Sequence, residues 1–165
     1  MENVLKTVDN VLRSHHKKII IRSQGEKQIS SSILQSLDQL AEKLGIVARK
    51  LHINETIKLS FSQPNVALAV VHAKPNLLEI SGRKNANNSL TLDILNAELK
   101  AEKRGLIASA RIPAETFRNQ SQVVYSFLFK DDILFQTSRR QKGYKPGELI
   151  ESVVSSKILA VTFFF

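Results

Sequence analysis

Cysteine is absent from this chain of 165 residues, so disulfides, thiolate metal sites and cysteine nucleophiles are excluded. Glycine occurs only six times, and no glycine-rich loop of the kind that holds phosphate is present. There is no run of roughly 18 consecutive apolar residues, so no segment reads as a membrane-spanning helix. The first residues, Met1 to Leu5, also lack the basic start and apolar stretch of a signal peptide.

The composition that remains is that of an ordinary globular protein with a basic excess. Hydrophobic residues make up 42% of the chain and charged residues 24%. The length suits one domain, or one small domain with an appendage, and allows a core that needs no covalent staples. Lys and Arg total 24 against 15 Asp and Glu, which gives a net charge of +9. This excess raises the question of a polyanionic partner.

Two helices are predicted in the first fifty residues. Apolar residues between Val4 and Leu12 recur at three- and four-residue spacing, which places them on one helical face. A second stripe runs from Ile33 to Leu44, and Ser32 with Gln35 before it fits a capping box. Gly45 is then either the end of this helix or a weak point within a longer one.

From Leu51 onward the apolar pattern changes to a period of two, which is typical of strands. Val66 to Val71 is a nearly continuous apolar run, as expected of a strand buried on both faces. Turn residues recur about every ten positions, which favours a β-sandwich or barrel. Strands are expected at 57–61, 66–71, 90–94, 106–112, 123–129, 133–136, 149–154 and 158–165, and turns at 63–65, 74–76, 82–89, 130–132, 143–147 and 155–157.

The predicted fold is therefore α+β and mainly β, with N-terminal helices followed by an antiparallel β-sandwich. Residues 1–50 are assigned to a helical segment and residues 51–165 to the sandwich. The chain ends in Val161 to Phe165, which is strongly apolar and carries no polar tail. This end is either a last strand packed into the core or the mark of a sandwich that is incomplete at its C-terminus. An exposed segment of this kind promotes aggregation.

Candidate catalytic groups are few. His15 and His16 are adjacent, so on a helix their side chains point about 100° apart. His52 and His72 stand alone in apolar surroundings, and the paired carboxylates at 131–132 fall in a predicted turn, where Asp favours the local geometry. The HExxH, GxSxG and P-loop spacings do not occur. We expect a protein that is not an enzyme, with no catalytic residue, no cofactor and no bound metal.

The basic residues gather in several clusters, of which the densest lies between residues 139 and 145. It suits phosphate contact combined with stacking on Tyr144, and a solvated loop is the alternative. No nucleic-acid recognition motif accompanies it, and most aromatic residues are Phe in predicted strands. Heparin-like glycans or acidic proteins would use the same charges. The candidate polyanion contacts are Arg139, Arg140, Lys142 and Lys145.

Three sites match the Asn-x-Ser/Thr rule for N-linked glycosylation. They are Asn54, Asn87 and Asn119. Each lies between predicted elements in a polar stretch, where an attached glycan would meet solvent. In a secreted chain all three are usable acceptors, whereas in a cytosolic chain they carry no meaning.

A helix, a strand that ends before proline, an apolar hairpin and a strand rich in Ser and Val follow one another along the chain. Their order and spacing resemble the GAIN domain, the juxtamembrane extracellular domain of adhesion G-protein-coupled receptors. In that family a helical subdomain precedes a twisted β-sandwich. The resemblance runs from about residue 25 to residue 162. The segments that carry it are Ser31–Leu44, Ala110–Pro113, Val123–Phe127 with Leu134–Phe135, and Ile150–Ser156 with Ile158–Thr162.

The chain departs from the family where the family has its self-cleavage site. That region carries paired cysteines, tryptophans and a His-Leu-Thr/Ser tripeptide, whereas this chain has neither Cys nor Trp. The tethered agonist strand and the seven-helix receptor portion are missing from the sequence as well. The resemblance thus implies a truncated GAIN domain that does not cleave itself.

Taken as such a fragment, the chain is a non-enzymatic glycoprotein scaffold for adhesion and signalling at the cell surface. Its expected place is the extracellular face of the plasma membrane, as part of a parent receptor. Its expected partners are the receptor's remaining strands, the transmembrane region, and an extracellular protein or glycan ligand. The alternative is a free-standing basic module that binds nucleic acid or another polyanion. That alternative depends on the charge of +9, the missing leader and the absence of cysteine.

A sandwich without the family's final strands should leave an open edge, and open edges pair with other chains. The isolated chain is therefore expected to aggregate or self-associate by strand addition. Size-exclusion chromatography with light scattering, together with a thermal melt, measures this directly. A monodisperse monomer that melts cooperatively would count heavily against the fragment hypothesis.

Overall fold

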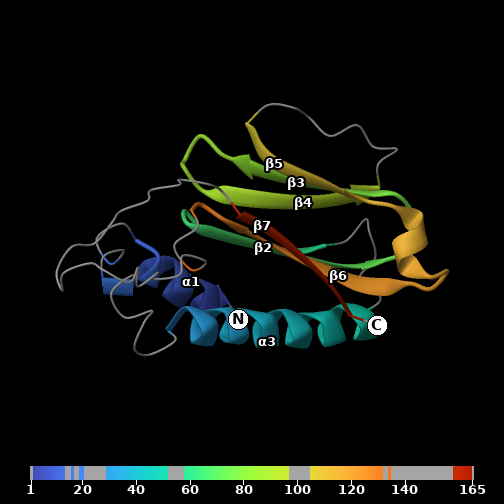
Figure 1. The fold of residues 1–165 in the computed structure, drawn as a ribbon, viewed down its shortest axis with the longest axis horizontal. Helices are drawn as coiled ribbons and strands as arrows, with labels where there is room; N and C mark the ends of the chain where they lie inside the picture. The colour runs from blue at the N-terminus through green and yellow to red at the C-terminus, as the bar shows by residue number, and fades with distance from the viewer. Residues whose placement is uncertain are drawn as a thin grey trace, which may run out of the picture.

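The protein is represented by a computed structural model that describes residues 2–13, 16, 19–20, 29–51, 58–96, 105–131, 134 and 158–164, and in the last range only the side chain of Leu159. Helices α1 (Glu2–Val11) and α3 (Ile29–Lys50) lie along one side of two stacked antiparallel sheets (Figure 1). This arrangement confirms the predicted fold class, α+β and mainly β. The division into two parts at residue 50 stays a prediction.

The larger sheet lies next to the helices and has the strand order β1-β2-β6-β7. Strand β2 pairs with β6 over eight residues, from Val66 opposite Phe129 to Ala73 opposite Gln122. Strand β7 pairs along the other side of β6, so the apolar C-terminal segment is a strand of this sheet. The bounds are β1 Leu59–Ser62, β2 Val66–Ala73, β6 Gln122–Phe129 and β7 Ile158–Phe164.

The smaller sheet covers the far face of the larger one and has the order β4-β3-β5 (Figure 1). Its central strand β3 pairs with β4 and β5, and the register with β5 shifts between Gly82 and Arg83. Strand β5 ends at Ile112 beside Pro113, as predicted, and the short 3-10 helix η2 (Ala114–Phe117) leads to β6. The strand bounds are β3 Leu78–Lys84, β4 Leu90–Asn96 and β5 Leu106–Ile112.

Strand β2 separates two hydrophobic cores, which explains the apolar run from Val66 to Val71. Its even-numbered core residues, such as Leu68, lie in the cluster that faces the helices, and its odd-numbered residues, such as Ala69, face the smaller sheet. Because side chains alternate across a strand, both sets must be apolar when both faces are covered. The small side chains on the sandwich side let the two sheets approach closely.

Helix α3 packs on β2 and β6 through one apolar stripe that includes Leu37, Leu44 and Ala48, all fully buried. A Cβ atom at Gly45 would lie 3.0 Å from Val123 Cγ1 of β6. Gly45 therefore lies where the helix comes closest to the sheet, and the helix continues past it to Lys50. The glycine that could have ended the helix serves close packing instead.

A buried carboxylate fastens helix α1 to the β1–β2 turn. The side chain of Asp9 is 3% exposed, and its Oδ1 accepts a hydrogen bond of 2.7 Å from the backbone N–H of Asn65. The Asn65 side chain also donates to the Asp9 carbonyl at 3.4 Å. These bonds satisfy a turn N–H and a carboxylate that would otherwise be buried without partners.

Three sequence expectations need correction or fall outside the described residues. Helix α3 begins at Ile29 and already includes Ser32, so the predicted capping box at Ser32 is wrong. Strand β3 was not predicted, because its short alternation ends in Gly82-Arg83-Lys84, residues assigned to a turn. The strand nevertheless continues through the polar residues Arg83 and Lys84, because one face of the smaller sheet is open to solvent. The predicted strand at 149–154 and most of the one at 133–136 lie outside the described residues.

The two sheets approach each other closely at Gly82 in β3. A Cβ atom there would lie 2.8 Å from Leu128 Cδ2 of β6. We expect Gly82→Ala to lower the free energy of unfolding by about 1–3 kcal/mol, because overpacking strains the core. Urea unfolding measures this change.

A double-mutant cycle with Leu128→Ala provides the check, and Ser109→Ala on the exposed face of β5 is the control. Leu128→Ala alone leaves a cavity, which costs about 2–5 kcal/mol. The methyl group at position 82 partly fills that cavity, so the double variant should lose less than the sum of the two single losses. Strictly additive losses would show that the two positions do not touch.

Candidate functional site

The two described histidines, His16 and His72, lie in different parts of the fold. His16 Nδ1 lies 2.9 Å from the Asn10 carbonyl oxygen, and His72 is half-buried in β2. Within the ranges that the structure describes, no three His, Cys, Asp or Glu side chains form a group that could hold a metal ion. His15 and His52 lie outside those ranges. None of the described helices is long and apolar enough to cross a membrane.

Two of the three predicted glycosylation sites are described, and both are exposed. Asn87 lies in the β3–β4 turn, and its Oδ1 accepts a 3.1 Å hydrogen bond from the Ser89 N–H. Asn119 follows helix η2 with a φ of 60°, in the left-handed region that Asn tolerates better than most residues. Asn54 lies outside the described residues. The four predicted polyanion contacts, Arg139, Arg140, Lys142 and Lys145, also lie outside them.

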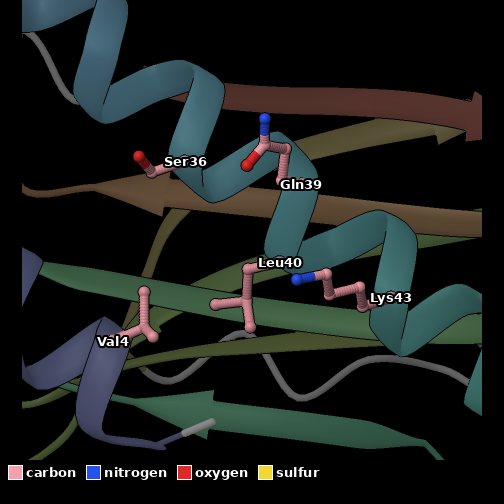
Figure 2. A pocket seen from close by; sticks show the side chains of 5 residues that line it. All are labelled: Val4, Ser36, Gln39, Leu40 and Lys43. Carbon is pink, nitrogen blue, oxygen red and sulfur yellow. The ribbon is translucent and has the colours of Figure 1, made fainter.

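A shallow groove of about 390 Å³ lies between the two helices (Figure 2). Val4 of α1 and Leu40 of α3 line it together with Lys43. Leu40 is buried and Val4 is 40% exposed, so the floor is apolar. The hydroxyl of Ser36 donates to the Ser32 carbonyl oxygen at 2.9 Å. This groove offers packing surface and no converging set of polar groups.

A second groove, of about 860 Å³, lies where the β3–β4 turn meets β1 and the start of β5. We call it the polar groove. The Lys84 N–H donates to the Gly105 carbonyl oxygen at 3.1 Å, which holds the start of β5 against the end of β3. Most of its lining residues carry hydroxyl, amide or charged groups. They are Ser60, Ser62, Arg83, Lys84, Asn85, Ala86, Asn88, Thr91, Leu92, Asp93 and Gly105.

The electrostatic centre of the polar groove is Asp93 of β4. One carboxylate oxygen, Oδ2, accepts a 3.0 Å hydrogen bond from Arg83 Nη1, and the other forms an ion pair with Lys58 Nζ. The three side chains are between 17% and 25% exposed. Pairs that are this sheltered are screened less by salt than fully exposed pairs. Asp93 thus holds two cations beside the groove, Arg83 of β3 and Lys58 just before β1.

Arg83 keeps unused donors in this arrangement. Its Nε and Nη2 atoms are buried and have no hydrogen-bond partner among the described residues. A buried donor without a partner is costly. The hydroxyl of Ser81, in the same strand, is also buried without a partner. The guanidinium therefore lies beside the polar groove with two N–H groups that are unpaired and covered by neighbouring atoms.

The basic pair Arg83-Lys84 is visible in the sequence, but nothing in the sequence links it to a groove. The link depends on the strand pairing that places Arg83 opposite Thr91 in β4, near Asp93. The one available signal was Asp93 itself, a carboxylate set between Leu92 and Ile94 in an alternating strand.

The fold has a known counterpart. The structure is similar to the full extracellular region of zebrafish Gpr126/Adgrg6, with a TM-score of 0.54 and 17% sequence identity. The match covers 82% of this chain and 17% of that chain, so the protein spans a small part of the neighbour's length. At this identity the similarity shows a shared fold alone. The neighbour is the extracellular region of an adhesion-type receptor, which is the receptor class that the sequence resembles. No protein-family model and no curated protein matches the chain.

Asp93 should be essential to the stability of the polar groove. We expect Asp93→Asn to lower the free energy of unfolding by about 1–3 kcal/mol, because Lys58 and Arg83 lose their shared partner and repel each other. Added salt should recover part of this loss, since it screens the repulsion. Urea unfolding at low and high salt measures both effects.

The matched control is Asp38→Asn on α3. The exposed Asp38 accepts a 3.3 Å hydrogen bond from the Tyr125 hydroxyl, and an asparagine keeps that acceptor. This variant should unfold close to the wild type, with no special response to salt. If both variants behaved alike, Asp93 would not hold the two cations in solution.

Proposed function

We propose that this chain is a non-enzymatic module of the extracellular region of an adhesion-type receptor. The observation that carries the proposal is the fold similarity to the Gpr126 extracellular region over 82% of the chain. It is supported by the order of elements, in which helices precede a two-layered antiparallel sandwich, as in the GAIN domains that the sequence resembles. Sequence and fold thus point to the same receptor class by separate routes.

The proposed role is that of a scaffold that holds other parts of the receptor and presents surfaces to ligands. Strand β6 is suited to this role because it pairs on both sides and is buried along its whole length. Its hydrogen bonds to β2 and β7 and the cores on its two faces resist separation of the strands. The partners in this role are the remaining strands and transmembrane region of a parent receptor, with an extracellular protein or glycan as ligand.

Glycosylation at Asn54, Asn87 and Asn119 belongs to the same proposal. The side chains of Asn87 and Asn119 are exposed, so a glycan on either would extend into solvent without displacing the core. Both belong to short connections outside the strands, at the β3–β4 turn and between η2 and β6. Such positions carry a large polar modification at little cost to folding.

The experiment places an epitope tag beside Glu2 in the endogenous gene and detects it on cells before and after permeabilisation. A receptor module should be stained on intact cells. Treatment with peptide N-glycosidase F should increase its mobility on a gel. Asn87→Gln and Asn119→Gln should each remove one step of that shift, whereas Asn85→Gln, in the same turn but outside any sequon, should leave it unchanged.

Staining that appears only after permeabilisation, together with no response to the glycosidase, would overturn the proposal. The weight would then move to a basic module that binds nucleic acid or another polyanion, which the net charge of +9 favours. Such binding weakens steeply with added salt. Charge reversal at Arg139 and Arg140 would show whether that cluster is responsible.

A further inference from the structure

We infer that the polar groove binds an acidic saccharide, whose sulfate or carboxylate group is held by Arg83. The occurrence of such a ligand in vivo depends on the proposed extracellular location, but the binding site itself does not. Four features of the described residues carry the inference. They are the charge of the groove, the free edge of the guanidinium, the hydroxyl and amide lining, and the absence of aromatic side chains from that lining.

The charge balance favours an anion. Arg83 and Lys84 line the groove, and Lys58 is paired with the same carboxylate as Arg83. Asp93 is the single carboxylate among the lining residues, so positive charge remains in excess. Because the Arg83 and Lys58 side chains are largely sheltered, their attraction for an anion is screened less than at an open surface.

The free donors of Arg83 have the geometry that an oxyanion requires. Asp93 engages Nη1 and leaves Nε and Nη2, which together form one edge of the planar guanidinium. Two parallel N–H groups on such an edge bind a carboxylate, sulfate or phosphate in a bidentate manner. Asp93 in turn fixes the guanidinium plane, so little side-chain freedom is lost when the anion binds. An oxyanion that displaces the atoms covering Nε and Nη2 would satisfy donors that are otherwise buried without partners.

The rest of the lining suits a saccharide. Ser60 and Ser62 are exposed on the same face of β1, and Thr91 of β4 adds a third hydroxyl. Asn85 and Asn88 contribute amides from the turn. Hydroxyl and amide groups donate and accept hydrogen bonds, as the hydroxyls of a sugar require. No aromatic side chain is among the lining residues, so the groove lacks the stacking platforms that single-stranded nucleic acids use.

The test measures binding of a fluorescent heparin-derived tetrasaccharide to the purified full chain by anisotropy. Arg83→Lys keeps the charge but removes the bidentate edge, and it should weaken binding about tenfold. Ser62→Glu places a carboxylate in the groove from an exposed position and should also abolish most of the binding. Because position 62 is at the surface of a short edge strand, this variant tests the site even if the Arg83 variant fails to fold.

Matched controls separate the site from general charge. Ser31→Glu adds the same carboxylate at an exposed position of α3, and Lys50→Gln removes a cation from the end of that helix. Both should bind like the wild type at roughly 150 mM salt, where exposed charges beyond about 8 Å are screened. Hyaluronan fragments, which carry carboxylates alone, show whether the sulfate or the carboxylate is recognised, and neutral dextran should not bind.

Several outcomes would overturn the inference. One is tetrasaccharide affinity that falls equally in all four variants, which indicates diffuse charge. A second is binding that Ser62→Glu leaves intact but charge reversal at Arg139 and Arg140 removes. A third is stronger binding of an oligonucleotide of matched charge with the same dependence on Arg83, which indicates a phosphate site for nucleic acid. Each can occur with the tagged protein still at the cell surface, so failure here is distinct from failure of the proposed function.

Discussion

The pairing of β2 with β6 is the interaction on which the other elements depend. These two strands form the middle of the larger sheet, and each contributes side chains to both hydrophobic cores. Helix α3 packs on one face of the pair, and the smaller sheet packs on the other. Because both faces are covered, the pair has little tolerance for polar substitution. The apolar run from Val66 to Val71 and the mostly apolar sequence of β6 reflect this constraint.

Small residues then determine how the layers stack on that pair. Gly45 brings α3 close to Val123, and Gly82 brings β3 close to Leu128. These two contacts lie on opposite faces of the same strand, β6, since residues 123 and 128 belong to different cores. Interiors packed at this density transmit local changes to their neighbours. The helices, the larger sheet and the smaller sheet are thus matched in shape as well as in hydrophobicity.

The sequence predicted best those elements whose pattern is long and regular. The stripe of α3, the double-sided strand β2 and the alternation that ends at Pro113 all have enough residues to reveal their period. Strand β3 was not predicted, because Gly82, Arg83 and Lys84 resemble a turn when only their local sequence is considered. Their strand conformation results from pairing on both sides with β4 and β5, which is tertiary information. The polar groove was missed for the same reason, because Arg83 and Asp93 meet only across that pairing.

The bond between Asp9 and Asn65 has a consequence for synthesis on the ribosome. Helix α1 emerges before Asn65, its partner in the β1–β2 turn, which follows Asp9 by 56 residues, and β6 emerges later still. During translation, Leu5, Val8 and Leu12 therefore have no core to enter and stay available to other molecules. Contacts between distant parts of a chain also slow folding, since the intervening loop must close first. The apolar face of α1 is thus a natural binding site for a chaperone in the interval before the sheet is complete.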